Sequence, residues 1–512
     1  MTHGSSQAPG AYGAASLGAL VAGGARPKLV PGESLELCSL ALELARAGAG
    51  GARVPVALAP LAAAGRGAAL FPGQIVGVVA AAGAAGGRGP LRAARLVHPP
   101  PPPAPATPLA ELAALYPPPP PDAPPALRAA LPPPLHVVVA AGPFTLDSDL
   151  DFEPLEALAA EVVAVDPPDL VVLLGPFVDI DHPLIAAGIV GSDVDEIFAA
   201  QVAPRLDRMR QARPGLQIAL VPSARDACSE WIAFPQPPLA AALSPADAWA
   251  RRDALGLLAP TPDRPGAKAP KDGIFLFPNP VQFRFNEIVF AVSSTDILFD
   301  LAAAECAIAP RAAPDAASQP LLASDAQLPP GSSPLGGVSQ ARAAAAAASA
   351  SIAAGDAAND PDGDDDDDDA AQAAIDDDSL ERSDKISRMF GHLLRQRSFY
   401  PLFPPAPSAC LDLSRALALT TTDADGSELP GPLVLQAVPD VFIIPSRLHP
   451  VVRPVASALC INPGFLAKGR AAGTYARMCI HPLRIDAADA ADADTAVEHA
   501  VPQRTAVEIR RI

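Results

Sequence analysis

The chain has 512 residues, room for two or three domains, and a formal net charge of −19. Residues 355–384 carry 14 acidic residues and one arginine, which is −13 of that charge and leaves −6 for the rest. Neither part has the basic surface that tight binding to a phosphate backbone requires, so the composition argues against strong direct binding of DNA or RNA.

The first quarter of the chain is rich in turn-forming residues. Residues 1–32 are mainly glycine, alanine and serine, and we expect a flexible N-terminus there. Residues 33–98 predict a small β-barrel, because glycine-rich turns separate four short strand-like runs: Ser34–Leu42, Arg53–Leu58, Gln74–Ala80 and Leu91–Val97. Residues 99–134 are proline-rich and predict an extended, semi-rigid connector.

Residues 135–311 have the pattern of an α/β domain. Three apolar runs each stop at a turn-forming pair, as strands buried on both faces do: Leu135–Ala141 before Gly142-Pro143, Leu170–Leu174 before Gly175-Pro176, and Leu216–Val221 before Pro222-Ser223. Amphipathic helices are expected between them at Glu153–Val165 and Glu196–Ala212, which implies a parallel sheet with right-handed crossovers. Further strands are expected at Ile274–Phe277, Val281–Phe285 and Glu287–Val292.

Two acidic segments interrupt the C-terminal half. Residues 312–383 contain six consecutive aspartates, Asp364 to Asp369, and predict a disordered acidic insert. Residues 384–512 regain apolar periodicity, with a helix expected at Asp384–Arg397 and strands at Val441–Ile444, Leu459–Ile461, Thr474–Ile480 and Thr505–Arg510. The second acidic run, Asp486–His499, predicts a solvated loop, with an interaction tail as the alternative for both runs.

The six cysteines are scattered without a C-x-x-C pair, which argues against a zinc knuckle. The uncharged span between Arg66 and Arg88 contains Pro72 and repeated glycines, and these favour strands and turns over a membrane helix. We therefore expect a soluble, intracellular protein with reduced thiols.

Several long segments, in one order along the chain, resemble the B subunits of DNA polymerase alpha, a family of non-catalytic accessory subunits. They include AAGPFT (140–145), PDLVVLLGPFVDIDHP (168–183), VPSARDA (221–227), VFAVSSTDILF (289–299), LRQRSFYPLFPP (394–405), PDVFIIPSRL (439–448) and CINPGFLAKGRAAGTYARM (460–478). The likeness runs through most of residues 51–311 and 381–512. The family usually has an N-terminal helical domain, which nothing in this sequence matches.

The resemblance implies an α/β plus β protein, with an OB-type β-barrel packed on a calcineurin-like phosphoesterase domain that lacks its metal ligands. It implies a nuclear, non-catalytic subunit of the polymerase alpha–primase complex, scaffolding the catalytic subunit during initiation of DNA replication. The implied partners are the C-terminal zinc-binding region of that catalytic subunit and the primase subunits, with DNA reached only through the complex and no membrane contact. Protein contact also suits the barrel better than base stacking, because Phe71 is the only aromatic residue between 33 and 97.

The resemblance also places the positions where active phosphoesterases hold two metal ions. These positions fall at Ala141-Gly142-Pro143, at Gly175-Pro176 with Asp179, at Pro222–Asp226 and at Asn462–Phe465, where most carboxylate and imidazole ligands are missing. We therefore predict no catalytic, cofactor-binding or metal-binding residues, and no cofactor. Asp179, Asp181 and His182 could be read as metal ligands, but a solvated loop or salt bridges with Arg225 is the favoured interpretation.

Other candidate residues have less specific patterns. His392, His449 and His481 are expected to be structural or on the surface. Lys468 and Arg470 could cradle a phosphate, although a packed loop with its neighbouring glycines is favoured. Thr107, Thr261 and Ser333 precede prolines in predicted loops, where phosphorylation would add charge to a flexible segment.

Two other functions remain open. One is an active metal-dependent phosphodiesterase or 3′–5′ nuclease of the same fold. The other is the small subunit of another replicative DNA polymerase. Three segments favour polymerase alpha instead: LRQRSFYPLFPP, GRAAGTYARM and the terminal EIRRI.

Overall fold

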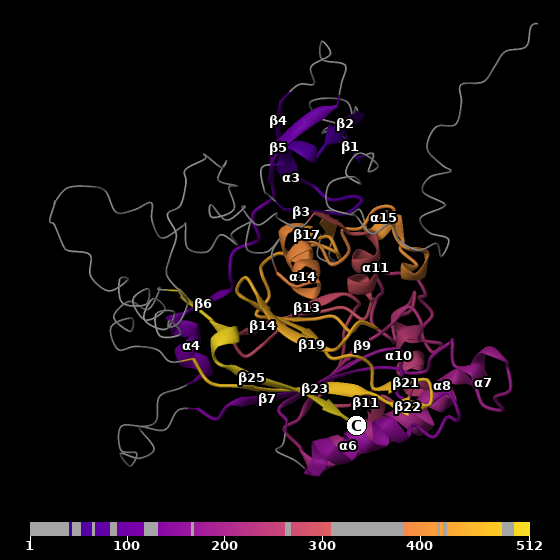
Figure 1. Ribbon diagram of the computed structural model, residues 1–512. Coiled ribbons are helices and arrows are strands. Elements are labelled where there is room, and N and C mark those ends of the chain that lie inside the picture. The colour runs from indigo at the N-terminus through magenta and orange to yellow at the C-terminus, as the bar shows by residue number, and fades with distance from the viewer. Residues whose placement is uncertain are drawn as a thin grey trace, which may run out of the picture. The chain divides into compact units, whose positions relative to one another are not determined.

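The computed structural model describes residues 40–43, 53–63, 67–81, 90–116, 132–164, 168–261, 268–308, 383–416, 420–422, 428–483 and 496–512 (Figure 1). All of them belong to one unit, formed by residues 1–311 and 375–512. The predicted flexible N-terminus at 1–32, almost all of the acidic insert at 312–383, and Ser333 lie outside the described residues. None of the described helices is both long and apolar enough to cross a membrane.

The larger sheet has six strands in the order β12-β9-β8-β7-β23-β25. Its parallel part comprises β7 (Leu135–Ala141), β8 (Leu170–Leu174), β9 (Gln217–Val221) and β12 (Ile274–Leu276). The last two strands, β23 (Thr474–Ile480) and β25 (Thr505–Arg511), run antiparallel to each other, and β23 also runs antiparallel to β7. The strands predicted for this sheet are confirmed, with shifts of one residue at some ends.

The crossover helices are also confirmed. The first, α6, spans Glu153–Ala164. The second is continuous in sequence but consists of α8 (Val194–Ile197), a π-helical turn η1 (Phe198–Val202) and α9 (Ala203–Ala212). Asp193 begins this helix with a capping box to Glu196, so its N-terminus is fixed by local side chains.

A second sheet has five strands in the order β13-β14-β18-β20-β19. These strands span Val281–Phe285, Ile288–Val292, Val441–Ile443, Ala458–Asn462 and Val451–Val455, respectively. Two helices cover this sheet: α11 (Ile297–Ala304) and α14 (Lys385–Arg395). The side chain of Asp384 caps the N-terminus of α14 by accepting from the backbone N–H groups of Ile386 and Ser387.

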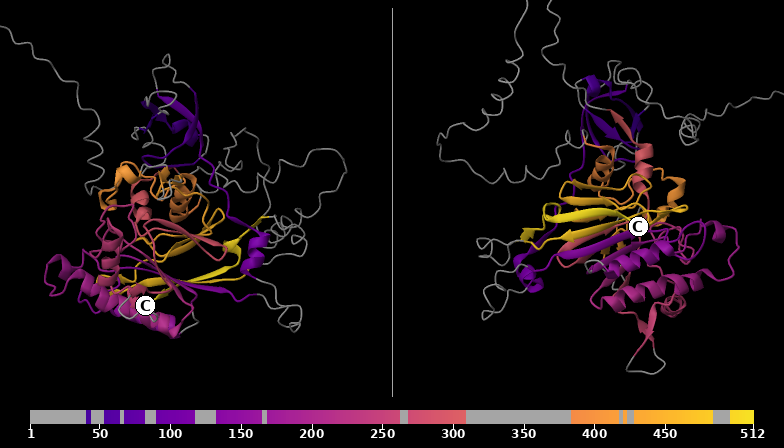
Figure 2. Two further views of the ribbon diagram at one scale, coloured as in Figure 1. Left: turned by 180° about the vertical axis from the view of Figure 1, so that it is seen from behind. Right: turned by 60° about the horizontal axis from the view of Figure 1, so that its bottom comes forward.

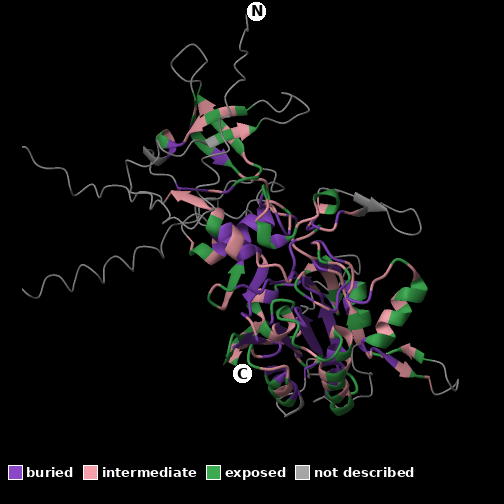
Figure 3. Ribbon diagram, turned by 90° about the vertical axis from the view of Figure 1, so that its right-hand side faces the viewer, coloured by how far each residue is buried: buried purple, intermediate pink, exposed green. Residues whose placement is uncertain are grey.

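Alternate residues of the central strands point into different cores, which defines four layers. In β8, Val171 and Leu173 pack against α6 and α9, whereas Leu170, Val172 and Leu174 pack against the second sheet. In β18, Phe442 packs toward the helix layer of α11 and α14, while Val441 and Ile443 pack back against the first sheet. The order helix, sheet, sheet, helix can be followed in Figures 1 and 2. The central strands of both sheets are largely buried in Figure 3, whereas the edge strands β12, β25, β13 and β19 are mostly intermediate or exposed.

The strands predicted to form a barrel make an open four-stranded sheet in the described residues, in the order β1-β2-β5-β4. These strands span Leu40–Glu43, Arg53–Ala57, Leu91–Val97 and Gly77–Ala81. The remaining nearby strand, β3 (Ala68–Leu70), pairs instead with β15 (Cys306–Ile308). Closure of the barrel is therefore not seen in the described part of the chain.

Two expectations from the sequence are wrong in part. Within the connector, Leu109–Leu115 are not extended, because they form the helix α4, with Leu109 and Leu112 buried. Ala106–Pro108 are extended as expected, but they form a paired strand, β6. Within the second acidic run, residues 496–498 form β24, which pairs with β6, and His499 is buried. Residues 486–495 of that run lie outside the described residues.

The other described elements are short. They are α3 (Ala59–Ala63), α7 (Pro183–Ala186), α10 (Pro245–Ala254), β10 (Leu258–Pro260), β11 (Lys268–Pro270), η2 (Pro407–Ala409), α15 (Leu413–Ala416), β16 (Thr420–Thr422), β17 (Glu428–Pro430), β21 (Ala467–Lys468), β22 (Ala471–Ala472) and η4 (Val501–Gln503).

Candidate functional site at the carboxyl ends of the parallel strands

The turns after β7, β8 and β9 lie side by side, where α/β proteins usually bind their ligands. The ladder continues into these turns, since the N–H of Gly142 donates to the Leu174 carbonyl at 2.8 Å and that of Gly175 donates to the Val221 carbonyl at 2.8 Å. A Cβ atom on Gly142 would come closer than 3.0 Å to the carbonyl oxygen of Pro176. One on Gly175 would come equally close to the Asp226 carboxylate. The glycines are therefore required by close backbone packing between the turns.

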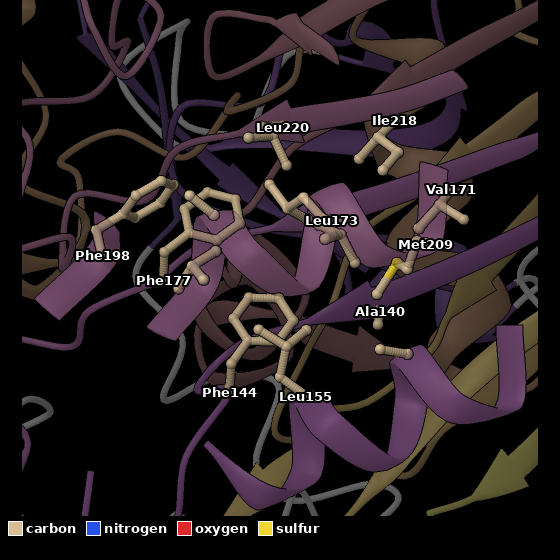
Figure 4. Close-up of a cluster of buried hydrophobic side chains, with 14 of the residues drawn as sticks. Ala140, Phe144, Leu155, Val171, Leu173, Phe177, Phe198, Met209, Ile218 and Leu220 are labelled. Atoms are coloured by element: carbon tan, nitrogen blue, oxygen red, sulfur yellow. The ribbon is translucent and has the colours of Figure 1, made fainter. Parts of the chain in front are cut away.

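Aromatic side chains fill the space beside these turns. Phe144 follows the first turn and Phe177 the second, and both are almost fully buried. Their rings stack with centroids 5.4 Å apart, and Phe198 of η1 packs edge-on to Phe177 at 5.8 Å. Figure 4 shows the three rings continuing the hydrophobic core of β8, β9 and α6. The strand ends thus carry core residues at positions next to those expected for ligands.

Asp226 is the most deeply buried acid of this region. From the sequence it is named only as the last residue of one expected ligand position, Pro222–Asp226. Its carboxylate accepts backbone hydrogen bonds from Ser223 at 2.7 Å, from Phe177, and from Val178 at 3.4 Å. Burial raises the pKa of Asp226 to about 7, although these three donors act in the opposite direction. Asp226 therefore holds the turn after β9 against the turn after β8, and its oxygens are occupied by main-chain donors.

Asp179, Asp181 and Arg225 form the salt bridges expected from the sequence. The Arg225 guanidinium pairs with Asp179, with Nε 3.1 Å from Oδ1, and its Nε is 3.0 Å from Oδ2 of Asp181. Burial raises the pKa of Asp179, while the Arg225 cation opposes this shift. The side chain of His182 takes no part in these salt bridges: its Nδ1 accepts from Leu184 N at the start of α7, and its Nε2 is 2.9 Å from the Leu146 carbonyl.

Two buried asparagines also connect loops near these strand ends. The Asn279 amide lies within hydrogen-bond distance of Gln236 and Ser293 and accepts from Ser294 N. The Asn462 Oδ1 accepts from Ser446 N at 2.8 Å and Gly464 N at 2.9 Å. Both side chains form hydrogen bonds with neighbouring protein groups, as buried amides generally do. In the described part of the chain, no three His, Cys, Asp or Glu side chains form a group suited to holding a metal ion.

The remaining candidates do not converge on this region. Lys468 and Arg470 are exposed on the two-stranded hairpin β21–β22. His392 is buried beside Glu305, with Nε2 3.3 Å from Oε1, and burial lowers its pKa. His449 and His481 are exposed.

A second polar cluster lies away from the strand ends, and the sequence did not predict it. Thr107 Oγ1 is 2.7 Å from His499 Nε2, and His499 Nδ1 is 2.7 Å from Asp440 Oδ2. Arg284 donates to the same threonine oxygen at 3.2 Å. Thr107 is 1% exposed in β6, so the predicted accessible loop at this position is wrong. No local pattern could reveal the cluster, because Thr107 and His499 are separated by most of the chain.

A neighbouring ion pair fixes the end of the same segment. Glu287 is fully buried and accepts from Tyr116 Oη at 2.5 Å and from Arg504 Nη2 at 2.8 Å. Arg504 Nε also donates to the His499 carbonyl at 2.7 Å. Hydrogen bonds therefore attach the β6–α4 segment at both of its ends, through Thr107 in β6 and through Tyr116 after α4.

Replacing Thr107 by valine tests this attachment. The change keeps the side-chain shape but removes the hydroxyl, so His499 and Arg284 each lose a buried hydrogen-bond partner. The free energy of unfolding should fall by about 2 kcal/mol. Limited proteolysis should cut near β6 faster, and the urea midpoint should fall. Thr107→Ser retains the hydroxyl and should behave nearly as the unchanged chain does; equal losses in both variants would contradict the role of the hydroxyl.

Comparison with known proteins finds a matching family and several relatives in sequence. The family of B subunits of DNA polymerase alpha/epsilon matches residues 137–453. The B subunit of DNA polymerase alpha from Schizosaccharomyces pombe is 26% identical over 356 residues, covering 69% of this chain and 43% of that protein. The mouse protein of the same name is 25% identical over 343 residues, covering 67% and 39%, and that of Saccharomyces cerevisiae is 30% identical over 176 residues, covering 33% and 21%.

The matched part thus spans about two fifths of the length of the fission yeast and mouse relatives. The family match itself covers more than half of this chain and includes most of both large sheets. The chain belongs to the family of DNA polymerase alpha/epsilon B subunits.

Proposed function

We propose that this chain is a non-catalytic accessory subunit of a DNA polymerase alpha complex, and that it binds and positions the catalytic subunit during initiation of replication. The relatives from fission yeast and mouse are named as B subunits of DNA polymerase alpha, which supports this assignment. The partners proposed are the C-terminal zinc-binding region of the catalytic subunit and, in the same complex, primase. The proposed location is the nucleus, and DNA would be met through the complex.

The observation that carries the non-catalytic role is the packing at the strand ends. Phe144 and Phe177 occupy core positions there, and the Asp226 carboxylate is engaged by backbone N–H groups. A two-metal hydrolase needs open carboxylate and imidazole groups at this place. We propose accordingly that the four layers are a phosphoesterase-type fold without its metal ligands and that the small sheet is an OB-type barrel.

Co-purification tests the assignment to the polymerase. The full chain, expressed with an affinity tag in its own cells, should recover a polymerase catalytic subunit together with primase, identified by mass spectrometry. Recovery of a different replicative polymerase without primase would assign the chain to another member of the family. Recovery of neither would contradict the proposed role.

An activity assay tests the absence of catalysis separately. Purified chain with manganese and a generic phosphodiester substrate should give no turnover above a buffer control. Asp179→Ala and the matched Asp181→Ala serve to assign any activity that does occur. Turnover abolished by the first change and kept by the second would establish a phosphodiesterase instead.

A further inference from the structure

Exposed hydrophobic side chains gather on three segments of the α/β part of the chain, all within the continuously described residues 168–261. Single exposed aliphatic residues are normal on a protein surface, whereas a group of them is typical of an interaction site. We call this group, with the segments that carry it, the α7–α10 surface. Its exposed large side chains are Ile180 (49% exposed), Ile189 (73%), Ile232 (65%), Leu243 (92%) and Trp249 (44%).

Hydrogen bonds and ion pairs join the three segments. The N–H of Ile180, ahead of α7, donates to the Arg225 carbonyl at 2.9 Å. From α10, Arg251 pairs with Asp195 of α8, and its Nε is 3.6 Å from Oε1 of Glu230. Figure 1 shows α7, α8 and α10 on the same side of the molecule. The exposed hydrophobic residues therefore belong to one region of the surface.

The backbone beneath these side chains is held by local hydrogen bonds. Helix α7 ends in a Schellman motif, in which Ile189 N donates to the Leu184 carbonyl at 3.0 Å and Gly188 N donates to the Ile185 carbonyl at 2.9 Å. The side chain of Ser244 caps the N-terminus of α10. A surface fixed in this way loses little conformational entropy when a partner binds.

The α7–α10 surface also has an excess of negative charge. The sequence from Val178 to Pro204 contains no lysine or arginine. Arg225 and Arg251 are each paired with two carboxylates of the same surface, so their charges are already balanced. The exposed carboxylates are those of Asp181, Asp193, Glu196, Glu230 and Asp247.

This combination of charge and apolar area selects among partners. The carboxylates repel the phosphates of nucleic acids and of anionic lipid surfaces. A second copy of the chain in a two-fold dimer would bring the same negative surface against itself. A segment with both apolar and basic residues matches both features, because it buries the exposed hydrophobic side chains and brings cations to the carboxylates.

From these observations we propose that the α7–α10 surface binds a basic amphipathic helix of another protein. The apolar face of the helix packs on Ile189, Leu243 and Trp249, and its lysines and arginines lie near the exposed carboxylates. The proposal goes beyond the assignment to a polymerase complex and does not depend on it.

The test uses the full chain and a fluorescein-labelled synthetic peptide with leucine and lysine on opposite faces of a helix. Binding measured by fluorescence anisotropy should weaken with salt and fall about tenfold in the double variant Ile189→Ser/Trp249→Ser. Ile75→Ser is the matched control and should bind normally, because Ile75 is 71% exposed but lies outside this surface. Circular dichroism should show all variants folded, since the replaced side chains are largely exposed.

A second pair of variants tests the contribution of charge. Glu230→Gln/Asp247→Asn removes two exposed carboxylates of the surface and should weaken binding of the same peptide about threefold. Glu508→Gln, on β25, removes a carboxylate whose side chain is 63% exposed elsewhere and should leave binding unchanged. Equal effects of the two changes would contradict a specific role for these carboxylates.

Hydrogen exchange identifies the surface that the peptide uses. The peptide should slow exchange in residues 180–194 and 243–252 and leave β2 unchanged. The proposal is overturned if these residues show no protection, or if a scrambled peptide or a leucine–glutamate peptide protects them equally. It is also overturned if the chain bound to a polymerase catalytic subunit no longer binds the peptide, because the surface is then already covered.

Discussion

Gly142→Ala is expected to destabilise the protein by about 3 kcal/mol or more. The new Cβ would lie closer than 3.0 Å to the Pro176 carbonyl oxygen, and the side chain of Phe144 follows at 3.1 Å. The Pro176 carbonyl and the Phe144 side chain both belong to buried turns. The clash can therefore be removed only if the backbones of the turns after β7 and β8 move apart. Urea unfolding monitored by circular dichroism should show the loss as a lower midpoint.

Gly215→Ala is the matched control for this change. A Cβ at Gly215 would meet nothing within 4 Å, and the expected change is within about 0.5 kcal/mol. Similar midpoints for the two variants would show that the turns at the strand ends are not packed as described.

Asp226→Ala is expected to lower the free energy of unfolding by about 3 kcal/mol. The substitution leaves the N–H groups of Ser223, Phe177 and Val178 without their acceptor in the protein interior. Asp226→Asn should also destabilise, because its NH₂ group must face one of these donors. The Asp181 side chain is 69% exposed, so Asp181→Asn should lower the free energy of unfolding by less than about 1 kcal/mol. If Asp226→Ala is as stable as Asp181→Asn, Asp226 does not hold the turn after β9 against the turn after β8.

The same carboxyl predicts a dependence of stability on pH. Its pKa rises from 3.8 in the unfolded chain to about 7 in the folded one, so the folded state holds the proton more tightly. The resulting stabilisation is fully present below about pH 4 and is lost as the pH rises through about 7. Between these limits the free energy of unfolding should fall by up to about 1.4 kcal/mol per pH unit relative to Asp226→Asn. A flat difference between the two proteins over this range would contradict the raised pKa.

The two large sheets could be predicted because their signals are local. Each strand from β7 to β9 is an apolar run ended by glycine or proline, and the helices between them show a repeating apolar face. The absence of a carboxylate or imidazole side chain at Gly142 and Pro176 is likewise visible in the sequence. The pairing of Arg225 with Asp179 and Asp181 was one of the expected alternatives and is confirmed.

The rest depended on contacts between distant segments. Asp226 has no unusual sequence context, and its role follows from three backbone donors that only the folded turns bring to it. Thr107 sits in a proline-rich stretch typical of a linker, but pairing of β6 with β24 and the ring of His499 bury it. The predicted barrel required strand pairings that short alternating runs cannot specify, and β3 pairs with β15 from another part of the chain.

The position of β23 has a consequence for synthesis of the protein on the ribosome. This strand pairs with β7, yet it emerges more than three hundred residues after β7 has been made. At ordinary translation rates the apolar edge of β7 remains bare for roughly tens of seconds. A premature stop codon ahead of Thr474 would leave it bare permanently, so such nascent products should depend on chaperones or aggregate rather than accumulate as folded fragments.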